Sequence, residues 1–365
     1  MKVGFQHMGN LCITLRALLE NLGCDVVLAP RPNKHTATIG TRHAPEMVCL
    51  PFKITLGDMF GCLENGADTL AFIGGGDWSC RFGYYGRIQC SILSGCGFQF
   101  RKVFVGPRDV KSIASTIHKL NNMSWTMSIK NALRGAAIAY HKSKLVELTE
   151  TLARQTRPVA HNPALVSRLE RELLIHIDRA TRISTLTALK SRVRTAFNDI
   201  QTDGKQKILR IMLVGESYCV VEPFVNFSII EQLGNRQVYV EPFLTAHRWL
   251  FSHLLRKEEN RYLSKKHAQK MAQPVWRYGT GGEDQVSIGH LMYAAEHGYD
   301  GIIHLMPFGC MPETAALPVF ERLSKYYHIP FLNFSLDEHS GPEGFYTRIE
   351  AFLDLLRFRS VEQVA

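Results

Sequence analysis

The feature of this sequence that most constrains its fold is a pattern that occurs twice, 232 residues apart. Gly57 to Asp68 leads into the apolar run Thr69–Ile73, and Gly289 to Asp300 leads into Gly301–Leu305. Each copy has the composition of a helix, a Gly-x-Asp turn and a short buried strand. Strands that alternate with helices form parallel sheets through right-handed crossovers. The repeat therefore predicts two similar α/β units.

The sequence around each copy has the same α/β character. Residues 1–107 and 207–365 alternate short apolar runs with helical periodicity, whereas residues 108–206 lack strand signals. We therefore predict an α/β fold with two Rossmann-like parallel-sheet domains, at 1–107 and 207–365, and a helical insert at 108–206. Within the two domains we expect a strand at Asp25–Ala29 and a helix at Pro223–Leu233.

The helical insert is basic. We expect Pro163–Ile200 to form a single helix within it, because apolar residues recur there at helical spacing. From His141 to Lys207 there are thirteen Lys or Arg residues against seven Asp or Glu. A solvated outer face explains this charge, and a surface for an acidic partner is the alternative.

The composition is that of an ordinary globular protein, with 45% apolar and 21% charged residues. No run of about eighteen apolar residues is present, so no transmembrane helix is expected. The first residues, Met-Lys-Val-Gly-Phe, begin a strand and do not resemble a signal peptide. We therefore expect a cytoplasmic protein without a membrane partner. The net charge of +10 suits an acidic ligand or partner, but no nucleic-acid-binding motif is recognisable, so nucleic acid is not expected.

Three of the nine cysteines lie in settings that favour metal binding. Cys49 precedes Leu-Pro51, Cys80 follows a triple glycine, and Cys310 follows the buried strand Ile302–Met306. The offset of 232 residues places Cys310 opposite Trp78, two residues before Cys80. Two equivalent strand ends would thus each deliver a cysteine, and reduced thiols that cluster in loops favour metal or redox chemistry. We predict that Cys49, Cys80 and Cys310 ligate an iron–sulfur cluster.

The remaining cysteines fall into two groups. Those within helices or at a helix–strand junction are expected in the core: Cys12, Cys24 and Cys62. Those that follow Cys80 or a strand end could complete a ligand set: Cys90, Cys96 and Cys219. Cys219, which follows Gly215-Glu-Ser-Tyr218, is the preferred candidate for a fourth thiol.

Candidate catalytic groups are the carboxylates close to these strand ends. Glu313, Glu216 and Glu338 could handle protons, or could act as ordinary caps and turn residues. His304 lies in the buried strand and is expected to be a hydrogen-bonded core histidine rather than a ligand. The glycine-rich segment Tyr278–Glu283 is expected to form a turn or lid in preference to an anion site.

Several of these segments resemble one family. They are Cys49-Leu-Pro-Phe-Lys, Cys80-Arg-Phe-Gly-Tyr-Tyr, Gly215-Glu-Ser-Tyr, Glu222-Pro-Phe-Val-Asn226, His304-Leu-Met-Pro-Phe-Gly-Cys-Met-Pro-Glu313 and Ser335-Leu-Asp-Glu-His339. They are similar to segments of the acyl-CoA dehydratase activase-related proteins, which are relatives of the cluster-binding subunits of 2-hydroxyacyl-CoA dehydratase and benzoyl-CoA reductase. The resemblance covers both α/β regions and is weakest across the helical insert.

The resemblance implies a cytoplasmic protein of anaerobic bacteria that holds a 4Fe–4S cluster through Cys49, Cys80 and Cys310. An 8Fe–9S double-cubane cluster is the alternative, which would need further ligands. An ATP-dependent activase is the implied donor of low-potential electrons, and a homodimer or heterodimer is a further expectation. The implied function is reductive, dehydratase-type chemistry on a small or CoA-linked substrate. A non-catalytic cluster-binding scaffold or regulatory partner of an activase is the alternative.

Overall fold

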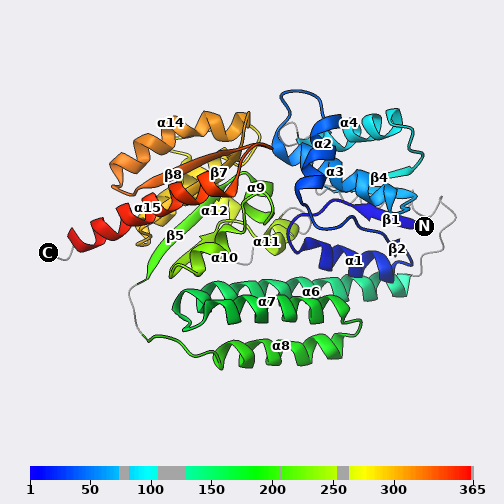
Figure 1. Ribbon diagram of the computed structural model, residues 1–365, viewed down its shortest axis with the longest axis horizontal. Helices are drawn as coiled ribbons and strands as arrows, with labels where there is room; N and C mark the ends of the chain where they lie inside the picture. Colours follow the sequence, from blue (N-terminus) through cyan, green and yellow to red (C-terminus); the bar gives the residue numbers. More distant parts are fainter. Residues whose placement is uncertain (74–81, 106–128, 205–207, 253–262, 363–365) are drawn as a thin grey trace. The chain divides into compact units, whose positions relative to one another are not determined.

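The computed structural model describes residues 1–73, 82–105, 129–204, 208–252 and 263–362 (Figure 1). Contacts between Cα atoms divide the chain into two compact units, and each unit is discontinuous in sequence. Unit 1 comprises Met1–Glu147, Leu174–Ser191 and Ala246–Lys257. Unit 2 comprises Leu148–Leu173, Arg192–Thr245 and Glu258–Ala365.

Unit 1 is built on a parallel sheet with the strand order β2-β1-β3-β4. The sheet and its helices alternate along the chain, as the periodicity predicts. Its strands are β1 (Lys2–Phe5), β2 (Asp25–Val26), β3 (Thr69–Ile73) and β4 (Arg101–Val105). Its helices include α1 (Leu11–Asn21), α2 (Lys34–His43), α3 (Leu50–Glu64), α4 (Phe82–Gly95) and α11 (Ala246–Leu250).

Unit 2 repeats this topology, with a second parallel sheet in the order β6-β5-β7-β8. Its strands are β5 (Leu209–Gly215), β6 (Val238–Pro242), β7 (Gly301–Pro307) and β8 (Phe331–Leu336). Its helices include α9 (Ser217–Val221), α10 (Ile229–Gly234), α12 (Lys265–Ala272), α13 (Asp284–Glu296), α14 (Met311–Tyr326) and α15 (Pro342–Glu362). The two sheets confirm the α/β class with two Rossmann-like parallel-sheet domains.

The middle of the chain is helical, and its helices contribute residues to both units. They are α6 (Ile129–Thr156), the 3₁₀ turn η1 (Arg157–Val159), α7 (Pro163–Arg179) and α8 (Ile183–Asn198). Within unit 2, the guanidinium of Arg157 is fully buried, donates to Ser167 Oγ at 3.1 Å and pairs with Glu170. Within unit 1, Arg16 Nη1 lies 2.6 Å from the carboxylate of Asp178 and so joins α1 to α7.

The sequence repeat corresponds to a repeated helix crossing. A Cβ atom on Gly57 of α3 would lie 2.1 Å from the carbonyl oxygen of Thr36 in α2. A Cβ atom on Gly289 of α13 would lie 1.9 Å from the carbonyl oxygen of Ala268 in α12. Both separations are far below contact distance, so each crossing requires glycine. Thr36 and Ala268 are themselves 232 residues apart, so the repeat extends to the contact partner.

The Gly-x-Asp turns also have the same conformation and make the same type of hydrogen bond in both units. Gly66 and Gly298 adopt positive φ angles of 89° and 68°, which favour glycine. The following Asp68 accepts the N–H of Lys2 at 3.2 Å, and Asp300 accepts the N–H of Arg210 at 2.7 Å. Each aspartate thus fastens the start of one strand to the start of its neighbour. The two units are therefore structural duplicates in this segment.

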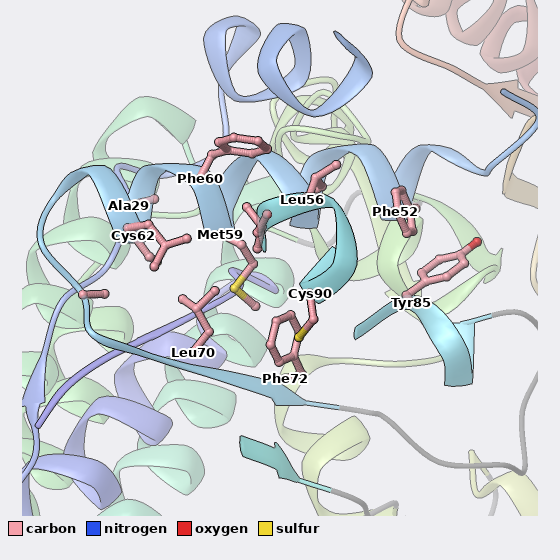
Figure 2. Close-up of a cluster of buried hydrophobic side chains, with 13 residues drawn as sticks. Ala29, Phe52, Leu56, Met59, Phe60, Cys62, Leu70, Phe72, Tyr85 and Cys90 are labelled. Carbon is pink, nitrogen blue, oxygen red and sulfur yellow. The ribbon is translucent and has the colours of Figure 1, made fainter. Parts of the chain in front are cut away.

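The core of unit 1 is an apolar cluster between α3, β3 and α4 (Figure 2). One face of α3 supplies Phe52, Leu56 and Met59, which are completely buried against Leu70 and Phe72 of β3. Burial of side chains this large contributes about 1.5–3 kcal/mol each relative to exposure. The cluster extends to the first turn of α3, and so supports the helix end that follows Cys49.

Three predicted elements differ from the structure. The single helix expected at Pro163–Ile200 is two helices, and no Pro or Gly marks the break between α7 and α8. The helix expected at Pro223–Leu233 begins only at Ile229, because Phe227 and Ser228 adopt positive φ angles. The strand expected at Asp25–Ala29 is regular only over Asp25 and Val26, and it ends with a hydrogen bond from the N–H of Val27 to the carbonyl of Val3 at 2.9 Å. No helix within the described ranges is long and apolar enough to cross a membrane.

Candidate functional site

Cys49 is the N-cap residue of α3. Its backbone is extended, with φ −73° and ψ 157°, and its sulfur does not cap the helix. Pro51 occupies the first turn, where a missing N–H costs no hydrogen bond. The amide dipoles of a helix N-terminus favour a thiolate at this position. Cys49 is half-buried, and its Sγ atom contacts the hydroxyl of Tyr85 in α4.

Cys310 is the N-cap residue of α14 and has the same local design. Its backbone is also extended, with φ −71° and ψ 107°, and Pro312 lies in the first turn. The N–H of Cys310 donates to the carbonyl of Pro307 at 3.0 Å. Cys310 is buried, whereas Phe308 and Met311 on either side are 60% and 56% exposed. Both described members of the predicted ligand set are therefore Cys-x-Pro helix N-termini.

Cys310 lies at the point of unit 2 where open α/β sheets bind their ligands. In the order β6-β5-β7-β8, the connections from β5 and β7 leave in opposite directions, so the topological switch point, where such sheets place a ligand crevice, lies at the carboxyl ends of these two strands. Gly215 ends β5 with a φ angle of 131°, and a Cβ atom there would lie 1.9 Å from the carbonyl oxygen of Leu305. The N–H of Glu216 donates to that same carbonyl at 2.9 Å. Glu216 and Cys310 thus follow adjacent strands.

Glu216 is a carboxylate with an altered proton affinity. It caps α9, accepting the N–H groups of Tyr218 at 3.1 Å and Cys219 at 2.9 Å. Burial, with a smaller contribution from the nearby carboxyl of Glu313, raises the pKa of Glu216 to about 7 against these hydrogen bonds. A carboxyl group with a pKa near neutrality can both accept and release a proton at physiological pH.

Glu313, in the first turn of α14, belongs to a polar network whose central pair is fully buried. Its Oε2 atom lies 2.6 Å from Nε2 of His304, and the two side chains are 1% and 0% exposed. Ser287 Oγ of α13 donates to Glu313 Oε1 at 3.4 Å, and Nδ1 of His304 lies 2.7 Å from Oδ1 of Asn333 in β8. His304 is therefore a hydrogen-bonded core histidine, as predicted.

The hydrogen-bond pattern fixes the charge of this pair. An amide oxygen can only accept, so Nδ1 of His304 donates to Asn333. A single proton then lies between Nε2 of His304 and Oε2 of Glu313, whichever atom holds it. The pair is neutral overall, which suits its complete burial. The pair connects the first turn of α14 to β7 through a buried contact.

A second polar cluster lies at the same edge of unit 2. Glu283, the N-cap residue of α13, accepts a hydrogen bond from Ser217 Oγ at 3.2 Å and pairs with Lys265 at 3.3 Å. The glycine-rich segment before Glu283 forms a turn. Asp284 holds this turn by accepting from the N–H of Thr280 at 2.8 Å and from Nε1 of Trp276 at 2.7 Å.

The additional ligand candidates have different surroundings. Cys219 is completely buried in α9 beside Glu216. Cys90 packs into the apolar cluster of unit 1, and burial raises the pKa of its thiol to about 11, which opposes the thiolate form. Cys96 is exposed, with its sulfur 3.5 Å from Nδ1 of His43. Glu338 is half-buried in the turn after β8.

The three cysteines expected in the core are there. Cys12, Cys24 and Cys62 are all buried, and burial raises the pKa of Cys24 to about 11 and that of Cys62 to about 12. Cys80, the third predicted ligand, lies outside the described residues.

A thiolate-ligated cluster fits the donor chemistry of the two described sites. Soft sulfur ligands at two helix N-termini suit an anionic iron–sulfur group. Within the described ranges, no group of three or more His, Cys, Asp or Glu residues lies close enough together to hold a metal ion. The ligand set Cys49, Cys80 and Cys310 therefore stays a prediction.

Sequence reasoning missed two contributors to these sites. Tyr85 contacts the sulfur of Cys49, and nothing in the spacing of the two residues indicates this. The sequence also does not predict the pairing of His304 with Glu313, because Glu313 occupies the third helical position, where Glu commonly caps a helix. The cap is not needed here because the N–H of Cys310 is bonded to Pro307. The carboxylate reaches into the core instead.

Comparison with known proteins supports the resemblance seen in the motifs. The sequence profile of the family described as "2-hydroxyglutaryl-CoA dehydratase, D-component" matches residues 136–356, more than half of the chain. The match includes Glu216, Cys310 and Glu313, and it begins after Cys49 and Cys80. No curated protein matches the chain. This chain belongs to the 2-hydroxyglutaryl-CoA dehydratase D-component family.

Proposed function

We propose that this chain is the cluster-binding component of a 2-hydroxyacyl-CoA dehydratase-type system. It accepts low-potential electrons from an ATP-dependent activase and uses them for reductive chemistry on a small or CoA-linked substrate. The observation that carries this proposal is the pair of Cys-x-Pro helix N-termini at Cys49 and Cys310, within a dehydratase-family chain.

Cys49, Cys80 and Cys310 are the proposed ligands of a 4Fe–4S cluster. When bound, such a group supplies one-electron reduction at low potential. Three protein ligands would leave one iron open to substrate or water. Cys219, beside Glu216, is the proposed extra ligand if the cluster is of the 8Fe–9S type.

The chain's own groups have separate proposed tasks. The helix N-termini after Cys49 and Cys310 stabilise negative charge on the sulfur atoms. Glu216, whose pKa is raised to about 7, is the proposed proton donor and acceptor at the crevice. Glu313 holds Cys310 in position through His304. Glu338 remains a further candidate for proton transfer.

Anaerobic reconstitution with iron and sulfide tests the ligand set. We expect a brown protein with four iron and four sulfide per chain, and loss of most of the iron when Cys49, Cys80 or Cys310 is changed to Ser. Cys12→Ala is the matched control, because Cys12 is a buried core thiol outside the candidate ligand set. A colourless, iron-free wild-type protein after reconstitution would overturn the proposal.

Catalysis is tested separately from cluster binding. With a partner activase, ATP and a panel of 2-hydroxyacyl-CoA thioesters, we expect turnover that Glu216→Gln reduces. If the cluster is reduced by the activase but no substrate turns over, the chain serves as a cluster-binding scaffold or regulatory partner. That outcome would support the proposed cluster binding and contradict the proposed catalytic role.

A further inference from the structure

We propose that Tyr85 is a positioning residue for the Cys49 sulfur. Its hydrogen bond to that sulfur tunes the reduction potential of the cluster that Cys49 ligates. The inference rests on the proposed function in that it takes Cys49 as a cluster ligand. It assigns a tuning residue that lies outside the set of ligands and proton-transfer groups described above.

The aromatic ring of Tyr85 is held in the core of unit 1. Tyr85 is 5% exposed, and its ring packs edge-on against Phe52, with the centroids 4.8 Å apart and an interplanar angle of 86°. Figure 2 shows Tyr85 beside Phe52 at one end of the apolar cluster, with its hydroxyl oxygen directed away from the cluster. That hydroxyl contacts Sγ of Cys49. The ring is thus anchored by apolar packing, and only its polar tip reaches the sulfur.

Neighbouring contacts fix the register of α4 against α3. Gln89, one turn after Tyr85 in α4, donates to the carbonyl of Phe52 at 3.2 Å and to Oγ1 of Thr55 at 2.8 Å. A Cβ atom on Gly86 would lie 3.0 Å from Phe72, so α4 lies close against β3. Both helices are therefore fixed near Cys49, and the hydroxyl of Tyr85 is directed at the sulfur by the fold.

The direction of the hydrogen bond between Tyr85 and Cys49 follows from the protonation state of a ligating sulfur atom. A sulfur atom that ligates iron carries no proton, so the Tyr85 hydroxyl must donate the hydrogen bond. A donor to an ionised acceptor forms a stronger hydrogen bond than a neutral pair does. Hydrogen bonds to cluster sulfur atoms stabilise the more negative, reduced state and so raise the reduction potential. Tyr85 therefore makes the site easier to reduce by a donor of limited potential.

The variant Tyr85→Phe removes the hydroxyl and keeps the aromatic ring packed against Phe52. Tyr84→Phe is the matched control, because Tyr84 is the neighbouring residue and is 52% exposed. In the reconstituted protein, a redox titration followed by electron paramagnetic resonance should give a more negative potential for Tyr85→Phe and an unchanged one for Tyr84→Phe. Equal potentials in Tyr85→Phe and the wild type would overturn the proposal.

A second measurement needs no iron. In the iron-free protein, held at a pH low enough to keep the thiol protonated, the infrared S–H stretching band of Cys49 is identified by its loss in Cys49→Ser. We expect Tyr85→Phe to shift this band and Tyr84→Phe to leave it in place, and an unshifted band would also overturn the proposal. A shifted band in a protein that never takes up iron would leave the hydrogen bond established and reject the cluster function. The two failures are therefore distinguishable.

Discussion

The helix ends at Cys49 and Cys310 share a sequence pattern, but they are stabilised in different ways. The first turn of α3 rests on apolar packing, because Leu50 and Phe52 are buried and Phe52 joins the core cluster of unit 1. The first turn of α14 is held by buried hydrogen bonds, through Glu313 and His304. Phe52 and Glu313 occupy the same position relative to the cysteine, three residues after it.

This difference predicts different tolerance to change. Apolar packing depends on volume and adapts to conservative substitution at modest cost. A buried hydrogen-bonded pair depends on both partners and leaves a costly unsatisfied group when one of them is lost. We therefore expect a substitution at the Cys310 end to lower the free energy of unfolding more than a comparable substitution at the Cys49 end.

The largest effect is expected for Glu313→Ala. Removing the carboxyl leaves His304 buried without its partner, which costs about 1–3 kcal/mol of unfolding free energy, and the cavity left by the side chain adds to this loss. Urea denaturation of the iron-free protein, followed by circular dichroism, measures the loss. Glu313→Gln retains hydrogen-bonding capacity and should lose clearly less. An equal loss in both variants would show that the volume of the side chain, and not its hydrogen bond, matters here.

The corresponding change at the Cys49 end is Gln89→Ala. Gln89 is buried and its amide bonds to Thr55 and to the carbonyl of Phe52, so the change removes neutral hydrogen bonds. The expected loss is about 1–2 kcal/mol in the same urea experiment. A loss as large as that of Glu313→Ala would erase the proposed contrast between the two ends.

The next prediction concerns the helix crossing that the two units share. Gly57→Ala and Gly289→Ala each place a methyl group within 2.1 Å and 1.9 Å of a carbonyl oxygen of the crossing helix. Overpacking of this kind typically costs about 1–3 kcal/mol, and we expect similar values for both. Gly95→Ala is the control, since no atom lies within 4 Å of an added Cβ there. A large difference between Gly57→Ala and Gly289→Ala would limit the duplication to backbone topology.

The repeat was predictable from sequence because its signals are local. Gly66 and Gly298 mark turns that need positive φ angles, and Asp68 and Asp300 follow them at fixed spacing. The α/β class and the helix starts after Cys49 and Cys310 were predictable for the same reason. Proline in the first turn and a preceding extended residue are short-range features.

The remaining features depend on contacts between segments distant in sequence. Tyr85 lies 36 residues from Cys49, and Asn333 lies 29 residues from His304, so periodicity could not pair them. The break between α7 and α8 was missed because no Pro or Gly interrupts the apolar period there. Burial of Cys90 in the core likewise follows from the packing of α4 on β3, which spacing alone does not reveal.

An effect of similar size is expected for Cys90→Ser, which tests the apolar packing at the Cys49 end. The substitution puts a hydroxyl into the cluster of unit 1, and a buried polar group costs about 1–3 kcal/mol when it lacks a partner. Urea denaturation measures this cost. Iron content after reconstitution should equal that of the wild type, because burial in the core opposes ligation. Loss of iron in Cys90→Ser without unfolding would make Cys90 a ligand.

Glu216→Gln tests how the stability of the Cys310 end responds to pH. In the folded protein the pKa of Glu216 is raised from its ordinary 4.5 to about 7, chiefly by burial. The folded state therefore binds this proton more tightly than the unfolded state does, so stability falls as the pH rises from 4.5 to about 7. Glu216→Gln carries no titratable proton and should lose this part of the pH dependence. The stability of the variant relative to the wild type should then increase over that interval in urea titrations at several pH values. Parallel pH profiles for the two proteins would mean that Glu216 ionises normally, and would remove it as the proton donor and acceptor of the crevice.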